Sequence, residues 1–265
     1  MPERHYQFIF VIGVEGSGTT MLTGILGKPA RVVGLGGSWE ATTIPRHDKE
    51  ALLLRAKFNR ATLKLWDRAA SWAEHLEAKQ SLARTIDRLL RMEKYAHATH
   101  VLYKRSAPFK KSPGYYLRDR YRPDLSDLPE VFGDLRIIAI YREPRASTHS
   151  CFRRRFREEL RQCAVISEEQ LTYLSAQLAS LDRSLYRIIN YEKFCAAPQN
   201  VVRELSNFCG LPADELASGV EQREVAEGMN ERWRRELAPA DRDFLDGFFD
   251  DRRLAQWQFL AQHAA

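Results

Sequence analysis

The sequence has no long apolar run. Its 265 residues are 44% hydrophobic, yet no segment approaches the ~18 consecutive apolar residues that a membrane span requires. Residues 1–5 lead directly into an apolar strand pattern and leave no room for the apolar core of a signal peptide. We therefore expect a cytoplasmic protein with no transmembrane segment.

Cysteine is also scarce. The four cysteines are Cys151, Cys163, Cys195 and Cys209, and they lack the close pairs that are typical of metal sites. We expect reduced, mostly structural thiols and no metal centre.

The net charge of +6 fits a protein that handles anions. The basic residues come with no motif that binds RNA or DNA, so no nucleic-acid partner is expected. There is no internal repeat, low-complexity segment or interdomain linker, and the length suits a single domain over residues 1–265.

The most informative stretch is residues 8–22. An apolar run of strand length is followed by a glycine loop (residues 13–18) and then by Met21, Leu22 and Ile25 at helical spacing. Glycines let the backbone approach a phosphate closely, and the N–H groups of the first helical turn point toward it. The pattern therefore predicts an anion-binding turn.

This turn differs from the nucleotide-binding pattern Gly-x-x-x-x-Gly-Lys-[Ser/Thr]. Gly13 and Gly18 have the required separation, but Thr19 stands where the lysine should be. That lysine stabilises charge on the β and γ phosphates, so its absence counts against ATP or GTP hydrolysis. A tight turn without a ligand is the alternative, and the two hydroxyls of Thr19 and Thr20 favour a ligand over it.

A second pattern covers residues 135–150. A buried strand ends at Arg142, Pro144 suits the first turn of a helix, and Ser150 lies about two turns along that helix. The permanently charged fork of Arg142 and the hydroxyl of Ser150 together suit a phosphate monoester. The alternative is an ordinary salt bridge and a helix serine.

The remaining patterns predict an α/β fold. Further strands are expected at residues 31–35, 100–103 and 186–192, which gives a three-layer sandwich around a mainly parallel sheet. Residues 46–95 contain neither Pro nor Gly and should form a helical insertion that caps the site. We expect the tryptophans of this insertion, Trp66 and Trp72, to lie in the core.

Several polar residues follow the predicted strands. Glu40 comes after the second strand and would bring a carboxylate to the anion site, although it could equally be a helix-start charge. His47 is a second titratable candidate, with a surface or capping role as the alternative. Lys104 follows the third strand. Ser167 fits a capping box that would open a further helix.

Together these residues resemble the sulfotransferases that use 3′-phosphoadenosine 5′-phosphosulfate (PAPS). Residues 14–20 look like the family's 5′-phosphosulfate loop, residues 141–150 look like its 3′-phosphate site, and residues 191–198 resemble a recurrent Tyr-Glu segment. The resemblance implies a P-loop NTPase-like sulfotransferase fold, with PAPS as co-substrate and 3′-phosphoadenosine 5′-phosphate (PAP) as product. The cofactor-binding residues it implies are Glu15, Gly16, Ser17, Gly18, Thr19, Thr20, Arg142, Ser150, Tyr191, Arg232, Trp233 and Arg234.

Local similarity is closest to the tyrosylprotein type. This implies Glu40 as the catalytic base and Lys104 as the cation that stabilises the leaving oxygen. His47, which the resemblance does not cover, stays the substitute candidate for the base. Many members carry Lys or Arg directly before Ser-Gly-Thr, whereas this chain has Gly16.

The resemblance implies sulfuryl transfer to an acceptor hydroxyl. A Golgi-type signal anchor is absent from the sequence, so we expect the hydroxyl of a glycan, a lipid-linked sugar or a small metabolite. An aromatic hydroxyl or a peptide tyrosine remains open. The alternatives are a P-loop small-molecule kinase and a PAP- or PAPS-binding protein without catalysis.

Overall fold

A five-stranded parallel sheet forms the centre of the protein, whose computed structural model describes residues 5–36, 42–67, 69–106, 124–221 and 228–262. The strand order is β2-β3-β1-β4-β5, and every neighbouring pair is parallel. The strands are β1 (Gln7–Gly13), β2 (Val32–Gly34), β3 (His100–Ser106), β4 (Leu135–Tyr141) and β5 (Tyr186–Asn190). All five lie where the apolar runs predict strands.

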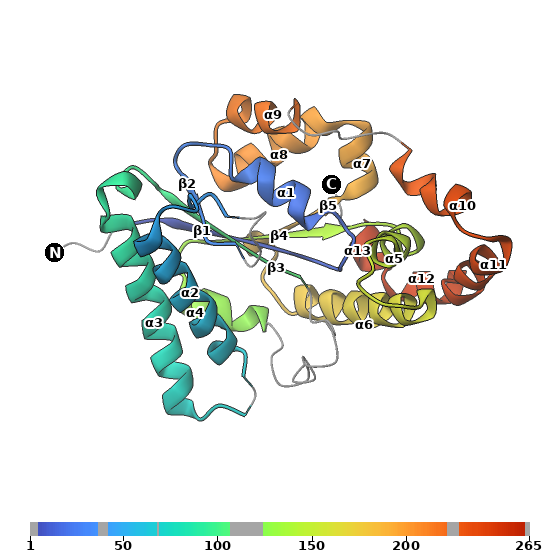
Figure 1. The fold of residues 1–265 in the computed structure, drawn as a ribbon, viewed down its shortest axis with the longest axis horizontal. Coiled ribbons are helices and arrows are strands. Elements are labelled where there is room, and N and C mark those ends of the chain that lie inside the picture. Colours follow the sequence, from blue (N-terminus) through green and yellow to red (C-terminus); the bar gives the residue numbers. More distant parts are fainter. Residues whose placement is uncertain (1–4, 37–41, 68, 107–123, 222–227, 263–265) are drawn as a thin grey trace.

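Helices cover both faces of the sheet, which gives the expected three layers (Figure 1). One face packs against α1 (Thr19–Leu26), α7 (Tyr191–Ala196), α8 (Pro198–Cys209) and α9 (Ala213–Glu221). The other face packs against α2 (Lys49–Leu65), α3 (Trp72–Arg91), α4 (Leu128–Val131) and α6 (Leu160–Ala179). Because both faces are covered, the strands are continuous apolar runs rather than alternating patterns.

The alternation of β1 illustrates how the sheet joins the layers. Phe8 and Phe10 point into the core beneath α2 and α3, while Ile9 and Val11 point into the core beneath α1 and α8. All four side chains are buried.

The predicted helical insertion consists of α2, α3 and the short η2 (Glu93–Tyr95), and it packs directly on the sheet face. Ser71 and Glu74 form a capping box that starts α3. Trp66 is buried, as expected, but the prediction for Trp72 is wrong, since its side chain is 78% exposed. Trp72 is the first residue of α3 and extends beyond the core that the later turns of the helix contact.

The capping box predicted at Ser167 is also wrong. Helix α6 begins at Leu160, so Ser167 lies in its interior. Its buried hydroxyl accepts a hydrogen bond from Thr148 Oγ1 at 3.0 Å, which joins α6 to α5 (Pro144–Arg153). The same residue types that cap a helix can sit inside one when a neighbouring helix satisfies the hydroxyl.

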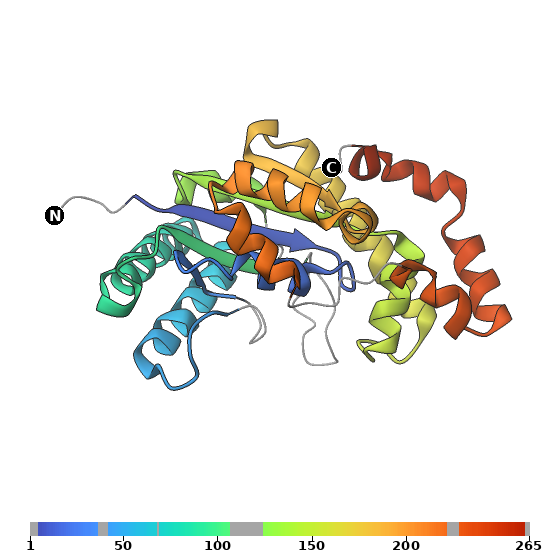
Figure 2. The same cartoon turned by 90° about the horizontal axis from the view of Figure 1, so that it is seen from above.

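The C-terminal region forms η5 (Met229–Glu231), α10 (Arg232–Glu236), α11 (Pro239–Phe248), α12 (Asp251–Gln256) and α13 (Gln258–Gln262). Figure 2 shows these helices beyond the end of the sheet at which β1 finishes. Within the described ranges, no helix is long and apolar enough to cross a membrane. In the same ranges there is no group of three or more His, Cys, Asp or Glu residues that could hold a metal ion.

The sheet topology fixes where a ligand can bind. The chain moves from β1 to β2 and β3 on one side and to β4 and β5 on the other. A crevice therefore opens at the carboxyl end of β1, where the strand order reverses, and ligands of open α/β sheets bind at this point.

Candidate active site

A cavity lies at the carboxyl ends of β1 and β4, where the two predicted anion-binding patterns meet. Its walls come from the glycine loop, the start of α1, the end of β4, helix α5, Tyr191 and the segment from η5 to α10. The lining residues are Gly16, Gly18, Thr19, Thr20, Met21, Arg142, Ala146, His149, Ser150, Arg153, Arg154, Tyr191, Met229 and Arg232.

The glycine loop is packed too closely to accept side chains at two of its positions. Gly16 has φ +81°, and a Cβ there would lie 2.3 Å from the carbonyl oxygen of Ser147 on α5. Gly18 has φ +100°, and a Cβ there would lie 2.8 Å from the ring of Tyr191. A lysine or arginine at position 16, directly before Ser17, would therefore have no room in this loop.

Two of the predicted loop residues direct their side chains away from the cavity. The fully buried Ser17 donates from Oγ to Val14 O at 2.8 Å. The buried Glu15 carboxylate pairs with Arg157 at 3.6 Å, and the Glu15 backbone N–H donates to Gln170 Oε1 at 2.9 Å. Neither residue lines the cavity; both hold the loop in shape.

Thr19 and Thr20 begin α1, whose N-terminus faces the cavity. Lys104, buried on β3, donates from Nζ to Thr20 Oγ1 at 2.5 Å. This contact follows from the sheet, because β3 is hydrogen-bonded to β1 along its whole length. The structure thus brings a cation to the first turn of α1, where the helix dipole already favours an anion.

Arg142 is held from three sides. Its Nη1 donates to Gly16 O at 2.9 Å, its Nη2 donates to Met229 O at 3.2 Å and its Nε donates to Asn230 Oδ1 at 2.8 Å. The guanidinium also stacks over the Tyr191 ring at 4.2 Å. Burial lowers the pKa of Arg142, but an arginine starts so far above neutrality that the group remains charged.

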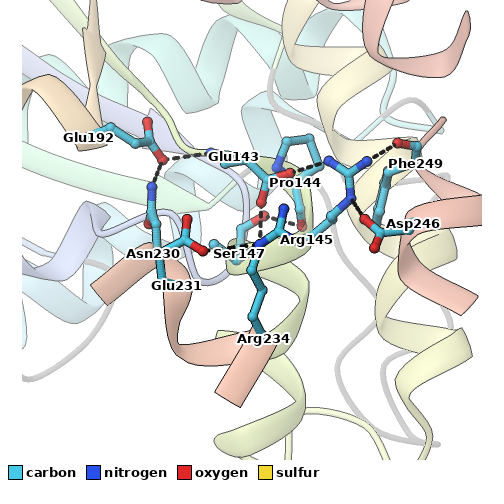
Figure 3. Close-up of polar contacts among 11 residues, drawn as sticks. Glu143, Pro144, Arg145, Ser147, Glu192, Asn230, Glu231, Arg234, Asp246 and Phe249 are labelled. Carbon is cyan, nitrogen blue, oxygen red and sulfur yellow. Dashed lines mark hydrogen bonds and ion pairs between the residues drawn. The ribbon is translucent and has the colours of Figure 1, made fainter. Parts of the chain in front are cut away.

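Asn230 connects Arg142 to a second network, which Figure 3 shows. Its Nδ2 donates to Glu192 Oε1, and the same oxygen accepts from the backbone N–H of Glu143 at 2.9 Å. Through Glu192, Asn230 therefore joins η5 to the first turn of α7 and to the residue that precedes α5. Sequence reasoning missed this residue, because the resemblance singled out only Arg232, Trp233 and Arg234 in this segment.

Helix α5 adds further groups to the cavity wall. Ser150 lies there as the sequence predicts, together with His149, Arg153 and Arg154. Sequence reasoning missed His149, although its position next to Ser150 and one turn before Arg153 was a usable helical signal. His149 Nε2 lies 3.3 Å from Glu236 Oε2, and burial lowers the pKa of the imidazole.

The three candidates from the basic tryptophan segment separate in space. Arg232 lines the cavity and donates from Nε to Glu236 Oε1 at 3.0 Å. Trp233 is buried in the core, and the exposed Arg234 pairs with Glu231 at 3.0 Å (Figure 3). Only Arg232 of the three is among the lining residues.

The two candidate bases are not placed at the cavity. Glu40 lies outside the described residues. His47 is exposed in the turn before α2 and is not among the lining residues.

Comparison with known proteins agrees with this geometry. A model of the sulfotransferase family matches residues 8–215. The sulfotransferase domain from the curacin biosynthetic pathway superposes with a TM-score of 0.55 at 15% identity, covering 92% of this chain and 97% of that domain. A sulfotransferase from Alicyclobacillus acidocaldarius gives a TM-score of 0.53 at 15% identity, covering 97% of this chain and 96% of its own.

A mouse sulfotransferase complexed with PAP superposes with a TM-score of 0.52 at 11% identity, over 97% of this chain and 89% of the mouse chain. At such low identities these superpositions show a shared fold. No curated protein sequence matches the chain.

Proposed function

Because this chain belongs to the sulfotransferase family, we propose that it transfers the sulfuryl group of PAPS to a hydroxyl of an acceptor molecule. The observation that carries the proposal is the cavity in which the glycine loop and Arg142 meet, with Nη1 of Arg142 bonded to Gly16 O at 2.9 Å. One nucleotide with a phosphate at each end can contact both patterns there.

The lining residues fit such a nucleotide. The close packing at Gly16 and Gly18 leaves backbone rather than side chains facing the cavity, which suits a 5′-phosphosulfate beside the start of α1. Arg142, Ser150 and Arg232 supply charge and a hydroxyl for the 3′-phosphate. A mouse protein of the same fold is complexed with PAP, which supports this ligand.

The proposed reaction is an in-line displacement at sulfur. The acceptor oxygen forms a bond to sulfur while the bond between sulfur and the bridging phosphate oxygen breaks, and PAP leaves. As in phosphoryl transfer, positioning and electrostatics supply most of the catalysis. Lys104 is the group that we assign to the charge on the bridging oxygen, since it lies at the first turn of α1.

Lys104 can also compensate for the lack of a cationic side chain at Gly16. The loop itself has no space for a lysine or arginine at position 16. A buried lysine from the neighbouring strand, bonded to Thr20, can supply the missing charge from the side of β3.

Glu40 is the base that we propose for the acceptor proton, with His47 as the substitute. Replacing the carboxylate by Glu40→Gln should lower turnover by about 10²–10⁴-fold if it is a general base. Affinity for PAP should be largely retained, and Glu50→Gln, in an exposed ion pair with Arg88, is the matched control. Unchanged turnover would exclude the role and make His47→Gln the next variant to measure.

Two rival functions are separable by one calorimetric series with PAP, PAPS and ATP. Preference for ATP would support a P-loop small-molecule kinase, which Thr19 in place of lysine disfavours. Tight binding of PAP without sulfate transfer to any acceptor would support a binding protein. Tight binding of PAP together with transfer supports the sulfotransferase.

The acceptor class is a further part of the proposal. We propose a hydroxyl on a glycan, a lipid-linked sugar or a small metabolite. Incubation of the enzyme and labelled PAPS with a host extract, followed by mass analysis of the molecules that gained sulfate, tests it directly. Label on protein tyrosine alone would contradict this acceptor class.

A further inference from the structure

A histidine, a glutamate and an arginine form a linked group at one wall of the cavity. His149 Nε2 lies 3.3 Å from Glu236 Oε2, and the other carboxylate oxygen of Glu236 accepts from Arg232 Nε at 3.0 Å. His149 and Arg232 line the cavity, whereas Glu236 is not among the lining residues. Glu236 therefore contacts both groups from behind the cavity wall.

The surroundings of His149 are strongly cationic. Arg142 approaches from the end of β4, Arg153 from the next turn of α5, and Arg232 from α10. Glu236 is the carboxylate that faces the ring from α10. Burial and the three arginines lower the pKa of His149, while Glu236 raises it, and the net direction is down. The ring is thus mostly neutral at neutral pH.

The position of the ring determines which nitrogen can titrate. Among the described residues, the polar contact of the His149 side chain joins Nε2 to Glu236. Neutral imidazole carries its proton on one nitrogen, and a bond to a carboxylate holds that proton on Nε2. An added proton then resides on Nδ1 and turns that nitrogen from an acceptor into a donor.

Resting on the proposed function, we infer that His149 is a further phosphate-binding residue, which takes up one proton when a phosphate monoester enters the cavity, and that Glu236 is its positioning residue. A phosphate dianion places two negative charges among groups that otherwise disfavour the imidazolium. The dianion stabilises the imidazolium of His149, and it competes with the carboxylate of Glu236 for the guanidinium of Arg232.

The sign of the pH effect follows from linkage. Binding raises the pKa of His149, so the complex holds a proton that the protein alone has lost. Affinity for the nucleotide therefore falls as the pH rises through the pKa that His149 has in the complex, by at most about tenfold per pH unit for one proton. The phosphate itself gains a proton at about pH 6. Above about pH 6.5, the pH dependence of the affinity therefore reports mainly on His149.

The test is a calorimetric titration with PAP in two buffers of different ionisation enthalpy. For the wild type we expect proton uptake on binding and an affinity about 3- to 10-fold lower at about pH 8.5 than at about pH 6.5. His149→Asn should abolish the uptake and flatten the profile. His97→Asn is the matched control, because the His97 ring contacts Ala30 O at 2.9 Å and does not line the cavity.

A second variant removes the positioning carboxylate. Glu236→Gln takes away the carboxylate that holds the proton on Nε2 and stabilises the charged ring, so the proton uptake and the pH dependence of PAP affinity should both become smaller. Proton uptake equal to that of the wild type would exclude the positioning role. Glu231→Gln breaks an exposed ion pair of the neighbouring segment, with Arg234, and should leave the affinity unchanged.

The outcomes separate this inference from the proposed function. PAP that binds with the same affinity across the window, without proton uptake, overturns the role of His149 and leaves the sulfotransferase proposal standing. Proton uptake that persists in His149→Asn overturns it as well. Absence of PAP binding at every pH overturns both.

Discussion

The two walls of the cavity use different means to face the same ligand. One, the loop wall, consists of the glycine loop and the first turn of α1, and it presents backbone held by close packing. The other, the side-chain wall, consists of Arg142, His149, Ser150, Arg153, Arg154 and Arg232, and it presents charge and hydroxyl groups. Figure 3 shows part of the network that orders the second wall, in which Asn230 of η5 contacts Glu192 of α7.

The difference predicts how each wall responds to change. A backbone surface tolerates no added volume, so one methyl group can remove its function. A surface made of several charged side chains loses affinity in parts, because each group contributes a fraction and the others remain. The predictions below test this contrast.

The largest effect is expected from Gly16→Ala in the loop wall. A Cβ at this position would lie 2.3 Å from Ser147 O, and the backbone has φ +81°, so the loop or α5 must shift. We expect PAP affinity to fall by about 100-fold or more, with a loss of about 2–4 kcal/mol in the free energy of unfolding. Calorimetry and denaturant unfolding measure the two quantities.

Gly247→Ala is the matched control. Gly247 lies in α11, and a Cβ there would meet no atom within 4 Å. The change should leave PAP affinity alone and stabilise the protein by about 0.5–1 kcal/mol. Equal losses of PAP affinity and of unfolding free energy in Gly16→Ala and Gly247→Ala would show that the packing at Gly16 has no special role.

Lys104→Met should affect turnover more than binding. The substitution keeps the length of the buried chain but removes the charge that bonds Thr20 at 2.5 Å. We expect kcat to fall by about 10²–10³-fold, with a smaller change in PAP affinity, because the charge on the bridging oxygen develops in the transition state. Lys57→Met, at an exposed position of α2, is the control for transfer assays. A loss confined to KM would contradict this role.

Asn230→Ala tests whether the side-chain wall depends on its supporting residues. Asn230 accepts from Arg142 Nε at 2.8 Å and donates to Glu192. Removing it should lower PAP affinity about tenfold, since Arg142 loses one of three fixed contacts. Asn200→Ala, where the amide bonds the exposed Arg203 at 3.1 Å, should have no effect. Unchanged affinity in Asn230→Ala would mean that Arg142 is oriented without it.

Ser150→Ala should produce the smallest change of the four. It removes one neutral donor from a wall that retains its arginines, so we expect PAP affinity to fall by about 3- to 10-fold. Ser218→Ala removes a hydroxyl that bonds Glu215 O within α9 and serves as the control. A loss larger than that of Gly16→Ala would reverse the contrast between the walls.

The sequence predicted the elements of this site better than their contacts. The apolar runs located all five strands, and the α/β class with a parallel sheet followed from them. The loop wall was predictable because its information is local: strand, glycines and helix start are continuous in sequence.

The side-chain wall was only partly predictable, because it is assembled from distant segments. Arg142 lies just before α5 and Ser150 lies within it, so the two were found together, whereas Asn230 and Glu236 reach the same wall from some 90 residues later. Periodicity gives the direction of a side chain relative to its own helix, but it does not tell which helix lies opposite. Trp233 illustrates the limit, since its basic neighbours suggested a ligand site and its ring packs in the core.

The central claim is that the two walls together hold one adenosine nucleotide that carries a phosphate at both the 3′ and the 5′ position of its ribose. The direct measurement is the affinity of the wild-type protein for PAP against that for AMP, which lacks the 3′-phosphate. The account predicts that PAP binds about 100-fold or more tightly than AMP. AMP has no 3′-phosphate, so it makes none of the contacts that this dianion makes with the arginines of the side-chain wall. Equal affinities for the two nucleotides would contradict it.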